Sequence, residues 1–241
     1  MPALLAVEGA CKTYGRLAVT RDVSFSVAAG EALGVIGPNG AGKTTLFNLI
    51  SGDVRPDAGR ILLEDRRIDT LAPSARCRAG IGRSYQIPHP FAGMTVLENL
   101  LVGATFGAGV KEAEGIERCV AILDDTGLLA KMNHMAGSLT LLDRKRLELA
   151  RALATQPRLL LLDEIAGGLT DLEVHELVQT IDQIRQSGIA IIWIEHIVHA
   201  LMAVVDRLIV VNFGRIIKEG DPSEVMASAE VQEIYMGMDL Q

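Results

Sequence analysis

Apolar and polar residues along the first 70 positions follow the pattern of short strands joined by turns. Segment 4–15 reads as a strand that ends in a turn, and segment 21–27 carries apolar residues at alternating positions, which is typical of a half-buried strand. The run EALGVIG at 31–37 predicts a buried strand, and RILLEDRRI at 60–68 predicts a strand and a turn. Between these two runs, TTLFNLIS has helical spacing and is followed by Gly52, a typical residue after the end of a helix.

The pattern changes in the middle of the chain, where helical spacing dominates from about 87 to 150. We interpret this interval, which includes an amphipathic stretch at 111–130, as a helical subdomain. Two strand-like runs follow, RLLLLDE and IAIIWIEH, with a predicted helix between them. Strands that alternate with helices favour parallel pairing and right-handed crossovers. A hairpin at 207–220 and helical structure from 221 onward complete the prediction.

The composition excludes several classes of protein. Hydrophobic residues make up 49% and charged residues 22%, so the chain can bury a core and is not intrinsically disordered. A net charge of -7 disfavours nucleic acid as a partner. The three cysteines show no CxxC spacing, which predicts neither a disulfide framework nor a zinc site. The N-terminus lacks a signal-peptide pattern and no apolar run approaches about 20 residues, so we expect a soluble protein.

The strongest chemical signal is the run GPNGAGKT, which fits the phosphate-binding pattern GxxxxGK(S/T). It lies between a predicted strand and a predicted helix, where backbone N–H groups and the helix N-terminus attract phosphate. Lys43 is expected to reach the β- and γ-phosphates, and Thr44 to offer its hydroxyl to Mg²⁺.

Acidic and histidine side chains follow two of the other predicted strands. Asp163 and Glu164 come directly after four leucines, at the strand end where ligand sites form in parallel sheets. Asp163 would hold Mg²⁺ through water, and Glu164 would polarise the attacking water. His196 follows the next strand and could lie beside the γ-phosphate.

The order of these motifs resembles that of the ATP-binding subunits of ABC transporters, over nearly the whole chain. The resemblance implies an α/β, P-loop ABC ATPase fold with a mostly parallel core sheet, an N-terminal antiparallel β subdomain and a helical subdomain. It implies a single nucleotide-binding domain over 1–241. It assigns Gln86, in GRSYQ, to Mg²⁺ and to communication with membrane subunits. It makes Asp163 a metal ligand, Glu164 and His196 catalytic, and it assigns ATP binding to Tyr14 and to Gly37, Pro38, Asn39, Gly40, Ala41, Gly42, Lys43, Thr44 and Thr45.

Further segments resemble the ATP-binding subunits of branched-chain amino-acid importers, notably GRSYQIPHPFAGMTVLENLLVG and DRLIVVNFGRIIKEGDPSEV. That branch also includes importers of other small polar solutes. The resemblance implies location at the cytoplasmic face of the cell membrane. It implies membrane permease subunits and a second ATP-binding subunit as partners, and indirectly a periplasmic or extracellular solute-binding protein.

Two segments depart from the family pattern. The signature Leu-Ser-Gly-Gly-Gln, which closes over the ATP of the opposite subunit, is replaced by Leu139, Thr140, Leu141, Leu142 and Asp143. Leucines can block close backbone approach to phosphate, and a carboxylate that faces phosphate is repulsive unless a cation intervenes. We therefore favour a heterodimer with a partner that carries an intact signature, while a homodimer stays possible. Thr170, in the loop that follows Glu164, also replaces the Asp or Asn that is usual in the family.

Two alternatives remain open. The first is a soluble ABC ATPase without a transport role. The second is a regulatory nucleotide-binding subunit with weak hydrolysis, which the altered signature favours and the presence of Glu164 and His196 disfavours. The sequence does not encode the transported substrate.

Overall fold

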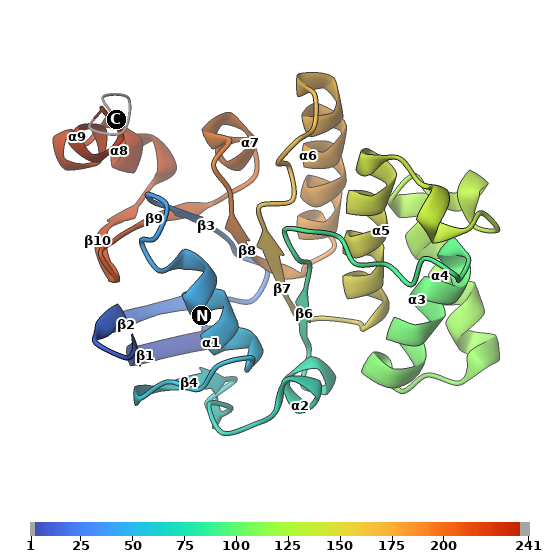
Figure 1. Ribbon diagram of the computed structural model, residues 1–241, viewed down its shortest axis with the longest axis horizontal. Coiled ribbons are helices and arrows are strands. Elements are labelled where there is room, and N and C mark those ends of the chain that lie inside the picture. Colours follow the sequence, from blue (N-terminus) through green and yellow to red (C-terminus); the bar gives the residue numbers. More distant parts are fainter. Residues whose placement is uncertain (1–2, 237–241) are drawn as a thin grey trace.

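We describe residues 3–236 of the chain in a computed structural model. A six-stranded sheet in the order β10-β9-β3-β8-β7-β6 forms its centre (Figure 1). All its neighbours pair in parallel except β9 and β10, an antiparallel hairpin. Every residue of β3, β8 and β7 is buried, as expected for a parallel sheet covered on both faces. The strands are β3 (Ala32–Ile36), β6 (Ile81–Arg83), β7 (Leu159–Asp163), β8 (Ala190–Ile194), β9 (Arg207–Asn212) and β10 (Arg215–Gly220).

A second, antiparallel sheet in the order β2-β1-β4-β5 covers one side of the central sheet (Figure 1). Helix α1 (Lys43–Ser51) lies between the two sheets, and its Phe47 is fully buried in their shared core. The helix therefore has a fixed position relative to both sheets. The strands are β1 (Ala3–Tyr14), β2 (Leu17–Ala28), β4 (Ala58–Leu63) and β5 (Arg66–Arg67).

Helices cover the opposite face of the central sheet (Figure 1). Their core surrounds Trp193, the largest fully buried side chain among the described residues. Apolar residues of α5 and α6 pack there against β7 and β8. The helices on this face are α5 (Leu141–Ala154), α6 (Asp171–Gln186), α7 (Val198–Met202), α8 (Pro222–Ala227) and α9 (Ala229–Met236).

A third hydrophobic cluster lies to one side, where α3 and α4 pack on α5. Helix α3 begins with a capping box formed by Thr95 and Glu98, which satisfies N–H groups of the first turn. Helix α5 contributes residues to this cluster and to the core around Trp193. It therefore joins the helical region to the central sheet. The elements here are α3 (Val96–Val102), the π-helix η1 (Gly103–Ala108), α4 (Glu112–Asp125), and the 3₁₀ turns η2 (Leu129–Lys131) and η3 (Ala136–Ser138).

The predicted fold class is confirmed, with a mostly parallel core sheet, an N-terminal antiparallel sheet and helical elements. Several boundaries differ from the prediction. The short strand β6 and helix α2 (Pro73–Arg78) were not predicted. The helix expected over 111–130 ends at Asp125, and the C-terminal segment forms two helices, with residues 237–241 outside the described range. Within residues 3–236, no helix is both long and apolar enough to cross a membrane.

Candidate functional site

The phosphate-binding pattern forms a tight loop between β3 and α1. A Cβ at Gly37 would lie 2.0 Å from the carbonyl oxygen of Val211, and one at Gly42 would lie 2.5 Å from that of Val19. Glycine is required at both positions because the loop is pressed against β9 and β2, and because φ is positive at each. The loop is therefore held in a curled conformation by the fold itself.

Lys43 is buried, and its Nζ donates to the carbonyl oxygens of Gly37 at 2.7 Å and Pro38 at 3.0 Å. Burial lowers the pKa of Lys43, while the nearby carboxylates of Glu164 and Asp163 act in the opposite direction. A cavity of about 170 Å³ beside the loop is lined by residues 39–45, Val19 and Glu164. Thr44 is exposed at the first turn of α1 and Thr45 is half-buried.

Asp163 ends β7 and is almost completely buried. Its Oδ2 accepts a hydrogen bond of 2.9 Å from Nη2 of Arg83. Burial raises the pKa of Asp163, and the guanidinium of Arg83 partly offsets this effect. The strand thus delivers a carboxylate to the sheet edge at which the phosphate loop begins.

Glu164 connects three of the sequence motifs. Its Oε1 lies 2.7 Å from Nε2 of His196, and its Oε2 accepts a 2.5 Å hydrogen bond from Nε2 of Gln86. Its φ of 47° is uncommon for a residue other than glycine, and such backbone strain clusters at functional sites. Three motifs that are far apart in the sequence therefore converge on one carboxylate, which also lines the cavity of the phosphate loop.

Sequence reasoning did not single out Lys145 as part of this cluster. Its side chain is buried, and its Nζ donates to the carbonyl oxygens of Gln86 at 2.7 Å and Glu164 at 3.3 Å. Burial lowers its pKa, opposed chiefly by Glu195. Sequence reasoning also missed the role of Arg83. The one signal available in the sequence was proximity to a motif, since Arg83 precedes Gln86 closely and Lys145 follows the signature segment.

The acidic residue of the signature segment is paired with a cation of the same chain. Asp143 is buried, and its Oδ2 accepts hydrogen bonds from Nζ of Lys131 at 2.5 Å and from Oγ1 of Thr140 at 2.7 Å. Although burial raises the pKa of Asp143, these hydrogen bonds bring it below its usual range. The condition under which this carboxylate would not repel phosphate, a nearby cation, is therefore met by Lys131.

The other signature residues divide between core and surface. Leu139 and Leu142 are buried, while Thr140 is exposed and caps α5 by accepting from the N–H of Asp143. Leu141 is 46% exposed and contributes an apolar side chain at the first turn of the helix. Thr170 similarly caps α6, through a capping box with Glu173. Both threonines therefore have a local structural role.

Tyr14 ends β1 with 46% of its surface exposed, and Nζ of Lys12 lies 5.7 Å from its ring centroid. It pairs with Leu17 across a tight turn. Val19, two residues further along β2, lines the cavity of the phosphate loop. The aromatic ring and the loop thus lie along the same strand pair.

The oxygen groups in this region suit Mg²⁺. Within residues 3–236, no three or more His, Cys, Asp or Glu side chains gather as a closed metal site. Mg²⁺ in nucleotide sites is held by one or two protein oxygens together with phosphates and water, so a closed set is not required. The hydroxyl of Thr44, the carboxylate of Asp163 and the amide of Gln86 are hard oxygen groups of this kind.

Comparison with known proteins identifies relatives over nearly the full chain. The ABC transporter family model matches residues 20–167. The high-affinity branched-chain amino acid transport ATP-binding protein LivG of Salmonella typhimurium is 36% identical over 97% of this chain and 98% of its own. The lipopolysaccharide export system ATP-binding protein LptB of Acidithiobacillus ferridurans is also 36% identical, with both chains fully covered. The ADP conformation of an ATP-binding cassette of an ABC transporter superposes with a TM-score of 0.91 at 33% identity, covering 98% of this chain and 100% of that one.

Proposed function

The chain belongs to the ABC transporter family of ATP-binding proteins, and we propose that it powers an importer of branched-chain amino acids or related small polar solutes. As a member of that family it is an ATPase subunit of a transporter. The import of amino acids is the proposal, supported by the similarity to LivG over 97% of the chain. A second candidate is a role in lipopolysaccharide export, because LptB is equally similar.

ATP binding is assigned to the loop 37–42 and to the start of α1. The N–H groups of the loop and the N-terminus of α1 attract the phosphates. Lys43 exchanges its contacts with Gly37 and Pro38 for phosphate oxygens, and Tyr14 stacks on the adenine ring. Thr44, Asp163 and Gln86 hold Mg²⁺, which when bound neutralises charge on the phosphates.

Hydrolysis is assigned to Glu164 as the group that orients and polarises the attacking water. Its contact with Nε2 of His196 at 2.7 Å holds the carboxylate in place beside the phosphate cavity. The second contact, from Gln86 at 2.5 Å, links the same carboxylate to the segment that follows β6. This convergence of motifs on Glu164 is the observation that supports hydrolysis over a purely regulatory role.

A separate cavity of about 310 Å³ is the candidate docking site for a permease segment. It lies between α2, β6, η1 and α5, and its lining includes Tyr85 and Arg151. Tyr85 is 45% exposed although it is aromatic, which is typical of a surface that a partner covers. In this proposal, 1–241 is one nucleotide-binding domain, about 87–150 is its helical subdomain, and the permease holds it at the cytoplasmic face of the membrane.

ATP closes a dimer of two such subunits, and hydrolysis reopens it. Differential affinity of ATP for the closed state supplies the work. We favour a heterodimer in which the partner carries an intact signature, because Leu141 leaves an exposed leucine where the family has glycine. The buried Asp143 no longer supports that view, since its charge is paired with Lys131.

The experiment that tests the proposed function starts with the tagged chain purified from membranes of its host. The permease that copurifies is identified by mass spectrometry, and the complex is reconstituted in proteoliposomes. We expect ATPase activity to rise when a leucine-loaded solute-binding protein is present on the side of the membrane opposite the ATPase, and radiolabelled leucine to move from that side into the compartment that contains the ATPase. A permease of the lipopolysaccharide export type, or ATPase activity that responds only to lipopolysaccharide, would refute import and favour the second candidate.

A further inference from the structure

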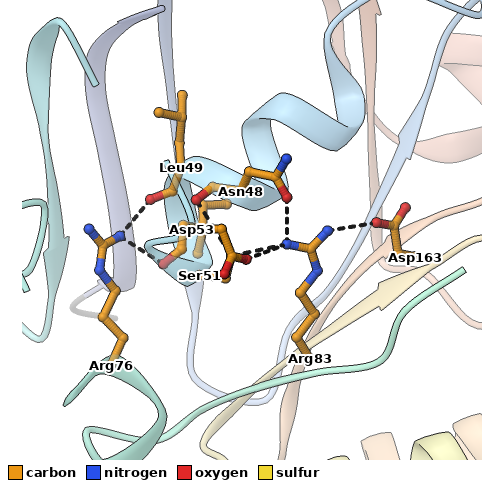
Figure 2. A network of polar contacts seen from close by, with 8 residues as sticks. Asn48, Leu49, Ser51, Asp53, Arg76, Arg83 and Asp163 are labelled. Carbon is orange, nitrogen blue, oxygen red and sulfur yellow. Dashed lines mark hydrogen bonds and ion pairs between the residues drawn. The ribbon is translucent and has the colours of Figure 1, made fainter. Parts of the chain in front are cut away.

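One side chain joins the permease cavity to the carboxylate proposed to hold Mg²⁺. Arg83 is the last residue of β6, and its guanidinium is only 7% exposed. Its Nη2 donates to Asp163, which ends the neighbouring strand. Its Nη1 faces the opposite way, toward the C-terminal end of α1 (Figure 2). The guanidinium is thus placed between the end of α1 and Asp163, which lies 80 residues beyond Arg83 in the sequence.

The contacts on the α1 side anchor the arginine. Nη1 donates to Oδ1 of Asn48 at 2.7 Å, to Oγ of Ser51 at 3.0 Å and to Oδ2 of Asp53 at 3.0 Å. Ser51 in turn donates to the same oxygen of Asp53 at 2.6 Å. The C-terminal end of a helix carries partial negative charge, which also favours a cation there. Arg83 is therefore held by several partners before it contacts Asp163.

This arrangement constrains Asp163. One oxygen of its carboxylate is fixed by Nη2 of Arg83 at 2.9 Å, and the side chain is 5% exposed. A guanidinium that is itself anchored restrains the position of the carboxylate oxygen that it binds, through a charge-assisted hydrogen bond. Mutation of a group that hydrogen-bonds to a metal ligand typically lowers metal affinity by about 10–100-fold.

We propose that Arg83 is a positioning residue that orients Asp163 for Mg²⁺, and that Asp53 acts through it from the wall of the permease cavity. Arg83 and Asp53 both line that cavity, and Asp53 is 38% exposed. Arg83 also lies 4.8 Å from the ring centroid of Tyr85, which lines the same cavity. A permease group that pairs with Asp53 would change how the guanidinium is held. This inference rests on the proposed roles of Asp163 and of the cavity.

The test measures metal binding directly, with Mn²⁺ as the probe. Free Mn²⁺ is followed by electron paramagnetic resonance in the presence of a non-hydrolysable ATP analogue. We expect Arg83→Gln to weaken Mn²⁺ binding by about tenfold or more, while binding of the analogue in EDTA stays unchanged. Arg83→Lys should not restore affinity, because a lysine cannot contact Asp163 and Asp53 together. Arg118→Gln, which removes an arginine from an exposed pair with Glu114 on α4, serves as the matched control.

The substitution Asp53→Asn tests whether Asp53 affects Mn²⁺ binding through Arg83 or only through its charge. It should weaken Mn²⁺ binding less than Arg83→Gln does, and it should have no further effect in the Arg83→Gln background, because it acts through that side chain. Unchanged Mn²⁺ affinity in Arg83→Gln, or full additivity of the two substitutions, overturns the inference. Should Arg83→Gln fail to fold, Asp53→Asn decides the question, and wild-type affinity in that variant overturns it.

Asp163→Asn distinguishes this inference from the proposed function. If Asp163→Asn binds Mn²⁺ with wild-type affinity, Asp163 is not the metal ligand, and its proposed role in the ATP site fails with the inference. If Asp163→Asn loses Mn²⁺ and Arg83→Gln does not, only the inference fails.

Discussion

The substitution Glu164→Gln removes the ability to accept a proton while leaving the shape of the side chain intact. The carboxylate contacts His196 and Gln86 through its two oxygens, and it is 16% exposed. After the substitution one of those oxygens becomes an NH₂ group. The amide of Gln86 can rotate so that its own oxygen accepts, which preserves the contact. We therefore expect the variant to fold with nearly wild-type stability.

The expected loss of ATPase activity follows from the role of a general base. Such a group contributes about 100- to 10,000-fold, or about 2.7–5.4 kcal/mol of barrier. The assay is phosphate release at saturating Mg-ATP, with nucleotide affinity measured separately by a fluorescent ATP analogue. Nucleotide affinity should stay near the wild-type value, because Lys43 and the phosphate loop are unchanged.

The control for this experiment is His199→Ala, which alters an exposed histidine three residues beyond His196. It should leave phosphate release unchanged. An activity of the Glu164→Gln variant within tenfold of wild type would refute the reasoning, since the convergence of Gln86 and His196 on this carboxylate would then have no catalytic purpose. A large loss of nucleotide affinity would equally show that the substitution damaged the binding site instead of the chemistry.

The same variant tests the dimer. If hydrolysis is blocked, light scattering with Mg-ATP should reveal any ATP-closed dimer that the chain can form alone. A dimer would mean that Leu141 does not prevent closure, which contradicts the heterodimer proposal. A monomer that retains ATP affinity would support an obligatory partner.

Three further predictions concern the scaffold of the site. Asp143→Asn should cost about 1–3 kcal/mol of stability at neutral pH. Because the folded-state pKa of Asp143 is depressed, the stability that its pairing with Lys131 contributes is present above the ordinary pKa and is lost as the pH falls below about 4. The free energy of unfolding in urea should therefore change less with acid for the variant than for the wild type. Arg76→Met should destabilise the fold by about 3 kcal/mol or more, since the buried guanidinium donates to the backbone carbonyls of Leu49 and Ile50 at the end of α1 and of Leu71 before α2. Equal urea midpoints for variant and wild type would contradict this. Gly42→Ala should weaken ATP binding by about tenfold or more, because the new Cβ would meet the oxygen of Val19 at 2.5 Å; unchanged affinity for the fluorescent analogue would show that the loop adapts.

The motifs could be predicted from the sequence because each is local. A glycine-rich run between an apolar strand and a helix carries its own geometry, and the strand ends that deliver Asp163 and Glu164 follow from four consecutive leucines. Strand β6 could not be predicted, because it has three residues and is stabilised by its parallel neighbour β7. Arg83 was missed for the same reason, since its partners are distant in sequence.

The signature segment shows that the effect of a charge depends on its neighbours in space. The sequence predicts that Asp143 repels phosphate unless a cation intervenes, but it does not identify that cation. Lys131, 12 residues earlier, pairs with the carboxylate. Thr140 keeps the capping role of a hydroxyl residue, so the start of α5 is intact as a helix N-terminus. The exposed leucine at 141 is therefore the feature of this surface that would make a pair of ATP sites asymmetric, because glycine stands at that position in an intact signature.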